Sequence, residues 1–381
     1  MVIKSSSHSL LRIRIIRDNL HRTPDNEKAR SPVMNRPRNI IGTMALACCS
    51  ALTPCAVAAA APATQVLNLY TARHYQTDEA LYHNFTRLTG VKINRIEGGE
   101  DALFERIRGE GANSPADVFI TVDIGRLWQA EQAGIFQKIK SPLLESRIPA
   151  AYRDPQGQWF GFSARARVIA YNRSMVQAGD IKNYEDLADP KWKGKLCIRS
   201  SSHPYNLSLT SSMIASMGEQ RAEAWVTGLA ANLARKPQGG DTDQLKAAAA
   251  GECALAVTNT YYMVRLLRSA RAEDKKVMEQ LGVVWPNQDN RGVHMNISGG
   301  GVVKHAPHRD AAIKFLEYLA GNEAQAYFAD GNNEWPVVPS VKVNNPALES
   351  LGTFKSDPLN VSQIGRNQPL AQRISDRAGF R

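Results

Sequence analysis

The chain has 381 residues and a formal net charge of +11 at pH 7. More than half of this excess lies in residues 1–58, which contain nine Lys or Arg and three Asp or Glu, so the rest of the chain is only mildly basic. Because no dense basic run and no interleaving of basic with aromatic residues occurs, the composition argues against nucleic acid as a partner.

Residues 1–61 are predicted to be an N-terminal extension and a cleaved signal peptide. Arg36 and Arg38 precede an apolar stretch over residues 40–52, and small residues follow at 56–58, the order typical of a secretion signal. Polar residues and a proline interrupt the apolar stretch, which favours cleavage over a permanent membrane span. The mature chain is therefore expected to begin near residues 59–64 and to be located in the periplasm.

Two details of this N-terminal region stay hypotheses. Met34 is a suitable start for the signal, so residues 1–33 are interpreted as an upstream extension from a misassigned start codon, which N-terminal sequencing of the unprocessed product would test. A lipid anchor on Cys48 or Cys55 is the alternative to a soluble product, but the residues before both cysteines fit a lipid-attachment signal poorly.

The mature chain, at roughly 320 residues, exceeds the size at which a single hydrophobic core keeps growing, so two lobes are expected. Thr77 is expected to cap a helix whose apolar face contains Leu81, Phe85 and Leu88 and which ends at Gly90. The other elements alternate in the same way. Strands are predicted at 66–70, 91–96, 118–122, 195–199, 253–257 and 281–285, and helices at 102–108, 124–133, 221–233 and 241–250.

This alternation predicts an α/β fold in which each lobe is a mainly parallel sheet flanked by helices. Residues 163–171 and 284–290 are predicted to cross between the lobes as a two-stranded hinge, and Gly299 to Gly301 to form a tight turn. The expected organisation is lobe 1 at 62–165 and 286–310, lobe 2 at 166–285, and C-terminal helices packing on the lobes within 311–381, with a peripheral tail from residue 346. An exported chain of this kind is interpreted as a hinged solute-binding protein that holds its ligand between the lobes.

Two cysteines, Cys197 and Cys253, remain in the mature chain. In an oxidising periplasm an even pair favours a structural disulfide, and two buried thiols are the alternative.

Three segments place oxygen and nitrogen donors directly after predicted strands. They are residues 70–75 after the first strand, 199–206 after the strand at 195–199, and 259–262 after the strand at 253–257. The last contains adjacent tyrosines, Tyr261 and Tyr262, at the start of a predicted helix, where the helix dipole favours negative charge. A Tyr-Tyr pair alone is more simply explained by one packed and one solvated ring. Three such segments at equivalent positions favour a binding site.

The chain resembles the periplasmic ferric-ion-binding proteins of ABC iron importers, in particular the subgroup with a tyrosine-rich site. The resemblance extends from Leu67 to about Pro339, and its most specific segments are residues 70–75, 161–172, 199–202 and 259–262. It implies a set of metal ligands from both lobes: His74, Tyr75, Tyr205, Tyr261 and Tyr262. It also implies Fe(III) as the transported ligand, and as partners a membrane permease with a separate ATPase subunit.

The chemistry of these residues fits that ion. Fe(III) is a hard cation that prefers anionic oxygen, and a bound metal deprotonates phenols whose pKa is otherwise near 10. Arg73 and, with lower rank, Arg165 are candidates to offset surplus phenolate charge or to hold a synergistic anion such as carbonate, and a salt bridge is the alternative role for Arg73. Arg167 is a weaker candidate of the same kind. Glu97 and Glu100 are expected to be solvated loop charges, and residues 200–202 either bind an anion or serve as a turn and helix cap.

Other functions receive less support from the sequence. No hydrolase, metalloprotease or phosphate-loop motif occurs, and His305 and His308 are interpreted as an exposed loop, so an enzyme is not expected. An iron-dependent redox enzyme is the weakest alternative. Within binding proteins, the alternative ligands are a polyamine, thiamine, sulfate or phosphonate. The mature protein is expected to be a monomer.

Overall fold

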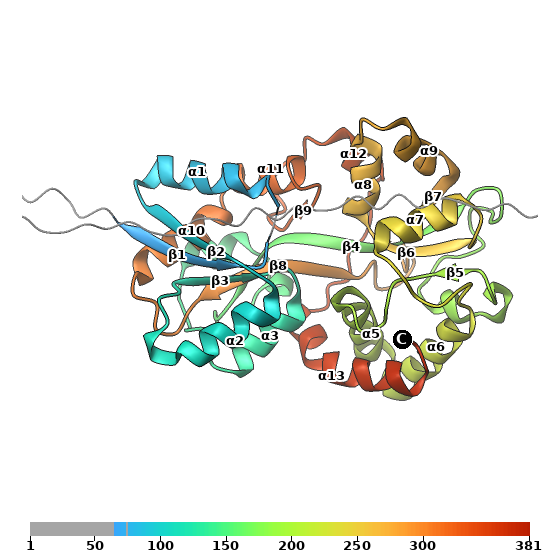
Figure 1. The fold of residues 1–381 in the computed structure, drawn as a ribbon, viewed down its shortest axis with the longest axis horizontal. Helices are drawn as coiled ribbons and strands as arrows, with labels where there is room; N and C mark the ends of the chain where they lie inside the picture. The colour runs from blue at the N-terminus through green and yellow to red at the C-terminus, as the bar shows by residue number, and fades with distance from the viewer. Residues whose placement is uncertain (1–64, 74) are drawn as a thin grey trace, which may run out of the picture. The chain divides into compact units, whose positions relative to one another are not determined.

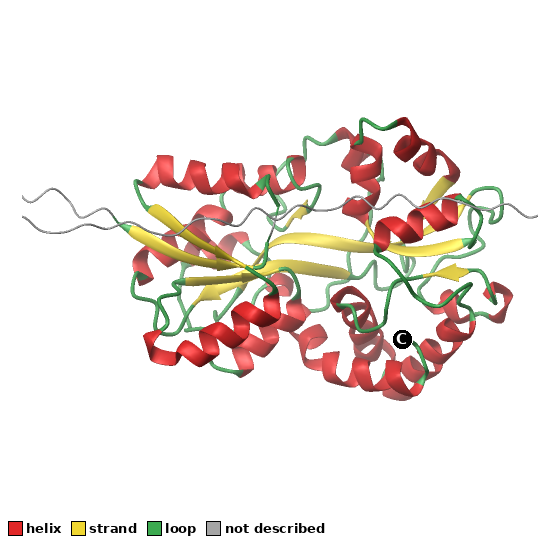
Figure 2. Ribbon diagram, in the orientation of Figure 1, coloured by secondary structure: helices red, strands yellow, loops and turns green. Residues whose placement is uncertain are grey.

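The computed structural model describes residues 65–73 and 75–381, so the predictions about residues 1–61 lie outside it. Within this part of the chain, the strands are β1 (Val66–Thr71), β2 (Lys92–Glu97), β3 (Val118–Thr121), β4 (Phe160–Asn172), β5 (Leu196–Cys197), β6 (Leu255–Asn259), β7 (Leu281–Val284), β8 (Met295–Val302) and β9 (Trp335–Pro336). Their order is β2-β1-β3-β8-β4-β6-β5, with β7 and β9 also paired to β4. Helices cover both faces of these strands in two lobes, which confirms the predicted two-lobed α/β fold (Figures 1 and 2).

Lobe 1 is built around β1, which pairs in parallel with β2 and β3. Its helices are α1 (Asp78–Thr89), α2 (Glu100–Glu110), α3 (Ile124–Gln132), α4 (Pro142–Arg147), α10 (Arg309–Leu319) and α11 (Asn322–Asp330). As predicted, α1 ends at Gly90 and buries Leu81 and Phe85, but Leu88 is 54% exposed. The Thr77 side chain bonds to Asn332 instead of capping the helix.

In lobe 2, β6 pairs in parallel with β5 and antiparallel with the second half of β4. The same part of β4 also pairs antiparallel with β7. Its helices are α5 (Pro204–Met217), α6 (Glu219–Ala231), α7 (Asp241–Ala249), α8 (Thr260–Arg268), α9 (Ala272–Gln280) and α12 (Pro346–Glu349). Among the described residues, no helix combines the length and apolar character that a membrane span needs.

Two antiparallel strands, β4 and β8, connect the lobes (Figure 1). All 13 residues of β4 are buried, and this strand exchanges β8 for β6 between Ala166 and Arg167. The other crossover was predicted at 284–290, which is wrong. That stretch stays beside lobe 2, where the N–H of Asn287 donates to the carbonyl of Lys182 at 2.9 Å, and β8 makes the connection instead.

The three consecutive glycines also lie in β8 and not in a tight turn. A Cβ atom at Gly299 would come within 2.4 Å of the Phe160 carbonyl oxygen, and one at Gly300 within 2.5 Å of the Phe119 carbonyl oxygen. Glycine is therefore required here because the backbones of β3, β4 and β8 approach closely.

The C-terminal region is not a peripheral tail. It contains α13 (Val361–Arg377), which packs against α3 of lobe 1 and against α5 and α6 of lobe 2. Its inner face buries Val361, Ile364 and Ile374, and Phe380 beyond it is 2% exposed. The prediction failed because the apolar residues are sparse, although they recur with helical spacing.

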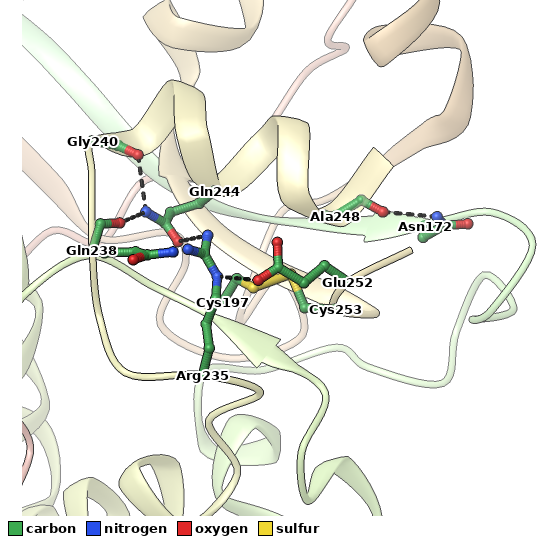
Figure 3. Close-up of a disulfide and its surroundings, with 9 residues drawn as sticks. All are labelled: Asn172, Cys197, Arg235, Gln238, Gly240, Gln244, Ala248, Glu252 and Cys253. Atoms are coloured by element: carbon green, nitrogen blue, oxygen red, sulfur yellow. Dashed lines mark hydrogen bonds and ion pairs between the residues drawn. A yellow bond between two sulfur atoms is a disulfide. The ribbon is translucent and has the colours of Figure 1, made fainter. Parts of the chain in front are cut away.

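A disulfide joins Cys197, at the end of β5, to Cys253, shortly before β6, with their Cα atoms 5.8 Å apart (Figure 3). This confirms the structural disulfide favoured from the sequence. Beside it, the Arg235 guanidinium pairs with Glu252 at 2.8 Å. The bond thus links β5 to the residues just before β6, and the helices that follow these two strands, α5 and α8, contain the predicted tyrosine ligands of lobe 2.

Candidate metal centre

The adjacent tyrosines lie in the first turn of α8, directly after β6. Tyr261 is 1% exposed and Tyr262 is half-buried, and their ring centroids are 4.2 Å apart. The pattern of a buried strand followed by a helix with apolar residues at Met263, Val264 and Leu266 determines this placement. Both phenols therefore lie near the positive end of the helix dipole.

Tyr205 lies in the first turn of α5, the helix that follows β5. Its hydroxyl accepts a hydrogen bond from the Tyr261 hydroxyl at 2.9 Å, so phenols 56 residues apart in the sequence meet directly. His203 precedes this helix, and its Nδ1 atom accepts the backbone N–H of Tyr205 at 3.2 Å. The predicted ligands of lobe 2 thus form a single cluster.

Tyr75 approaches this cluster from lobe 1. The guanidinium of Arg265, on α8, lies 5.4 Å from the ring centroid of Tyr75, 5.0 Å from that of Tyr261 and 5.6 Å from that of Tyr262. Tyr75 and Arg265 also line a cavity of about 340 Å³, together with Thr77, Asn332 and Asn333. His74, the remaining predicted ligand, lies outside the described residues.

The surroundings of three of these phenols, Tyr75, Tyr205 and Tyr261, raise the pKa and so favour the neutral form. Burial raises the pKa of Tyr205, and the arginine at position 165 only partly opposes this effect. Burial also raises the pKa of Tyr261, and the neighbouring phenols Tyr205 and Tyr75 raise it further. For Tyr75, burial and then the Glu334 carboxylate raise the pKa. A cation bound here would supply the positive charge that these phenols need in order to ionise.

Arg73 and Arg165 both form ion pairs with carboxylates of the chain. Arg73 is 4% exposed and pairs through Nε with Asp78 at 2.7 Å and through Nη1 with Glu334 at 3.1 Å. Arg165 donates from Nη2 to Glu334 at 2.7 Å and from Nη1 to the carbonyl of Val122 at 2.6 Å. The salt-bridge alternative for Arg73 therefore describes this structure, and both cations lie behind the phenols as fixed positive charge.

Glu334 is the site residue that sequence reasoning missed. Burial opposes its ionisation, but Arg165 and then Arg73 outweigh that effect and lower its pKa to about 2. The Ser163 hydroxyl also donates to it, at 2.7 Å. The only signal in the sequence was an acidic residue beside Trp335 in a stretch otherwise free of charge, which does not identify its partners, Arg73 just after β1 and Arg165 on β4.

Three weaker candidates are also placed by the structure. Glu97 is exposed and pairs with Arg95, as expected for a solvated charge. Glu100 is half-buried at the start of α2 and not a free loop charge: its carboxylate accepts the N–H of Val122 at 2.6 Å, and burial, followed by the nearby Asp123, raises its pKa to about 7. Arg167 lies beneath Tyr205 in a separate ion pair with Asp241.

The loop at 200–202 serves mainly as a turn. The hydroxyls of Ser200 and Ser202 bond to each other at 2.8 Å, and the hydroxyl of Ser201 donates to the carbonyl of Phe380. Within residues 65–73 and 75–381, no three His, Cys, Asp or Glu side chains gather in a metal-binding group.

Two lobes joined by a strand pair, with polar side chains from both at one cleft, define a hinged binding protein. The chain belongs to the bacterial extracellular solute-binding protein family, whose model matches residues 113–355. It is 47% identical to iron uptake protein A1 of Synechocystis sp. over 342 residues, covering 90% of this chain and 95% of that protein. It is 50% identical to iron uptake protein A2 of the same organism, over 83% of this chain and 90% of that protein. Among solved structures, it is similar to a Trichodesmium protein (IdiA, FutA) in complex with iron and citrate ligands, at 53% identity and a TM-score of 0.80, covering 83% of this chain and all of that one.

Proposed function

We propose that this chain is the periplasmic solute-binding component of an ABC importer, and that it captures ferric iron between its lobes. The observation that supports this most strongly is the contact of two buried phenols, Tyr261 and Tyr205, with Tyr262 and Tyr75 at the same cleft. Phenolate oxygen is the donor that a hard trivalent cation prefers. The names of the iron uptake relatives support the same ligand.

In this proposal the iron docks first on the tyrosines of lobe 2, which are already in contact. Closure about β4 and β8 then adds Tyr75 and His74 from lobe 1. Each phenol that binds the metal loses its proton, and the guanidinium groups of Arg73 and Arg165 stabilise the phenolates at longer range. No step of this capture is catalytic.

A synergistic anion such as carbonate would require donors that are not already taken. Because Arg73 and Arg165 direct their guanidinium groups to Asp78, Glu334 and Val122, we assign such an anion to Arg265. The guanidinium of Arg265 lies 5.0 Å from the ring centroid of Tyr261, and Arg265 also lines the cavity that it shares with Tyr75.

The closed, loaded form would present both lobes to a membrane permease, with ATP hydrolysed by a separate subunit. We propose that the protein acts as a monomer after removal of the signal peptide in residues 1–61. Mass spectrometry of protein purified from the periplasm would measure the mature N-terminus, and size-exclusion chromatography with light scattering would measure the oligomeric state.

The test of the function is the colour of the loaded protein. Phenolate bound to Fe(III) gives a visible charge-transfer band, so protein loaded with Fe(III) citrate and desalted should be coloured and should contain one iron per chain. The double substitution Tyr261→Phe/Tyr262→Phe should abolish the band. The matched control is Tyr82→Phe/Tyr318→Phe, which removes two hydroxyls from the outer helices of lobe 1 and should leave the band unchanged. Wild-type protein that stays colourless and takes up no iron contradicts the proposed function. A double variant that retains the wild-type spectrum contradicts the assignment of the tyrosines.

A further inference from the structure

A buried polar cluster lies beneath the tyrosines of lobe 2. At its centre is Asp241, the first residue of α7, which is fully buried. Its carboxylate accepts hydrogen bonds from the Arg167 guanidinium at 2.9 Å, the Arg199 guanidinium at 3.3 Å and the backbone N–H of Asn259 at 2.9 Å. Asp241 therefore joins the start of α7 to the ends of β5 and β6.

Arg167 extends this cluster to the helix that contains Tyr205. Besides Asp241, its guanidinium donates to the side-chain oxygen of Asn259 at 2.9 Å and to that of Asn206 at 2.7 Å. The Asn206 amide in turn donates to the carbonyl of Arg199 at 2.8 Å. Arg167 is also the first residue of β4 that pairs with β6, so the cluster includes the strand that connects the lobes.

The fixed groups are immediate neighbours of the proposed ligands. Asn206 follows Tyr205, and Asn259 lies two residues before Tyr261. The guanidinium groups of Arg167 and Arg199 lie 5.9 Å and 5.4 Å from the ring centroid of Tyr205. The cluster thus holds both helix starts whose phenols meet at 2.9 Å.

We propose that Asp241 is a positioning residue of the metal site: its carboxylate holds Arg167, Arg199 and Asn259 so that the phenols of Tyr205 and Tyr261 converge. This inference rests on the proposed function, because it assigns a role in metal capture. Asp241 does not bind the metal itself.

The energetics favour a role in geometry over a role in stability. Removing an aspartate and an arginine from water costs several kcal/mol each, so a buried pair contributes little net stability compared with apolar residues of the same volume. Such a pair does fix the directions of its hydrogen bonds, since Nη1 and Nη2 of Arg167 donate to Asp241, Asn259 and Asn206 at 2.7–2.9 Å, while its buried Nε has no hydrogen-bond partner among the described residues. Residues that orient metal ligands without contacting the metal typically change metal affinity by about 10–100-fold when replaced.

The experiment measures ferric iron binding by competition with citrate, together with the position of the charge-transfer band. In Asp241→Asn, the carboxylate charge that holds two arginines is lost, so affinity should fall by about 10–100-fold and the band should shift. The matched control is Asp117→Asn in lobe 1. Asp117 is also fully buried and accepts the His308 imidazole Nδ1 at 3.0 Å and the Asn68 N–H at 2.6 Å, but it lies at the end of β3 opposite to the cleft. The Asp117→Asn variant should lose thermal stability, but its iron affinity and its charge-transfer band should stay unchanged.

A second variant decides the matter if Asp241→Asn does not fold. Asn206→Ala removes the acceptor between Arg167 and α5 while the ion pair with Asp241 remains, and it should shift the band in the same direction. Weaker binding with a shifted band in the cluster variants, and unchanged values in Asp117→Asn, supports the proposal. Unchanged affinity and spectrum in a folded cluster variant overturns it, as does an equal loss of affinity in Asp117→Asn. Failure of the wild-type protein to bind iron would instead overturn the proposed function.

Discussion

At the scale of single residues, Glu334 has the largest predicted effect on stability. Its carboxylate is the shared partner of Arg73 and Arg165, all three side chains being almost fully buried. Glu334→Gln removes the negative charge that neutralises two buried guanidinium groups. Loss of one partner of a buried ion pair costs about 3–5 kcal/mol. We therefore expect chemical denaturation at pH 7 to show a free energy of unfolding lower by that amount. Glu131→Gln is the control, because the Glu131 carboxylate accepts hydrogen bonds from two neutral groups, the Trp159 indole and the Gln132 amide, and the variant should lose about 1 kcal/mol.

The pH dependence of stability follows from the same carboxylate. Its pKa is about 2 in the folded protein, below the ordinary value of 4.5, so the folded state holds fewer protons than the unfolded state. The stabilisation is therefore complete above pH 4.5 and is lost as the pH falls from 4.5 towards 2. As the pH falls from 7 to 3, the free energy of unfolding should decrease less for Glu334→Gln than for the wild-type protein. Equal decreases in the two proteins would contradict the assignment of this pKa.

The site residues divide into those that the sequence could predict and those that it could not. Tyr205, Tyr261 and Tyr262 follow buried strands, and the ends of parallel strands meet at the same edge of a sheet, so their convergence in lobe 2 was predictable. Glu334 comes from a loop after α11, and its partners, Arg73 just after β1 and Arg165 on β4, are 261 and 169 residues away. Only the tertiary fold brings these charges together. The same is true of Glu100, whose burial depends on the Val122 backbone.

At the scale of elements, the packing of α13 against α3 depends on a glycine. A Cβ atom at Gly365 would lie 2.4 Å from the Cβ atom of Trp128, so Gly365→Ala must push the two helices apart. Overpacking of this kind costs about 1–3 kcal/mol, which outweighs the gain in helix propensity. Gly109→Ala in α2 is the matched control, because nothing lies within 4 Å of its added Cβ atom and the change should stabilise by about 0.5–1 kcal/mol. Thermal unfolding of both variants measures the difference. A more stable Gly365→Ala would contradict this packing.

Element boundaries were predictable where local signals are strong. Gly90, with φ +72°, ends α1, and Gly134, with φ +65°, follows α3, in the manner expected for helix ends. The failures concern elements whose identity depends on distant partners. Residues 284–290 were predicted to cross between the lobes, yet the backbone N–H of Asn287 donates to the carbonyl of Lys182, and Arg291 just beyond this stretch pairs with Glu185, both in lobe 2. The glycines of β8 were interpreted as a turn because a sequence does not show which backbones approach them.

At the scale of the whole molecule, two connections coordinate the lobes. Strands β4 and β8 pass between them, and α13 contacts both. On α13 the Gln368 amide donates to Asp123 of lobe 1 at 2.9 Å, and the Asn367 amide donates to the carbonyl of Ser211 of lobe 2 at 3.3 Å. Closure about β4 and β8 must preserve or exchange these contacts. Because the proposed ligands come from both lobes, we expect the number of protons released on metal binding to depend on which phenols the closed form brings to the metal.

The slope of the apparent iron affinity against pH should report how many phenols bind the metal in the closed protein. Burial raises the pKa of Tyr75, Tyr205 and Tyr261 above 10, so all three carry their protons at neutral pH, and each must release one when it binds iron. The apparent affinity for ferric iron should therefore rise with pH, by about one decade per pH unit for each engaged phenol. Competition against a chelator of known protonation, between pH 6 and 8, gives this slope after correction for the chelator. Tyr261→Phe should lower the slope by about one, whereas Tyr82→Phe should leave it unchanged. A slope of zero for the wild-type protein would mean that no phenol ionises on binding, and the tyrosines would then not be the iron ligands.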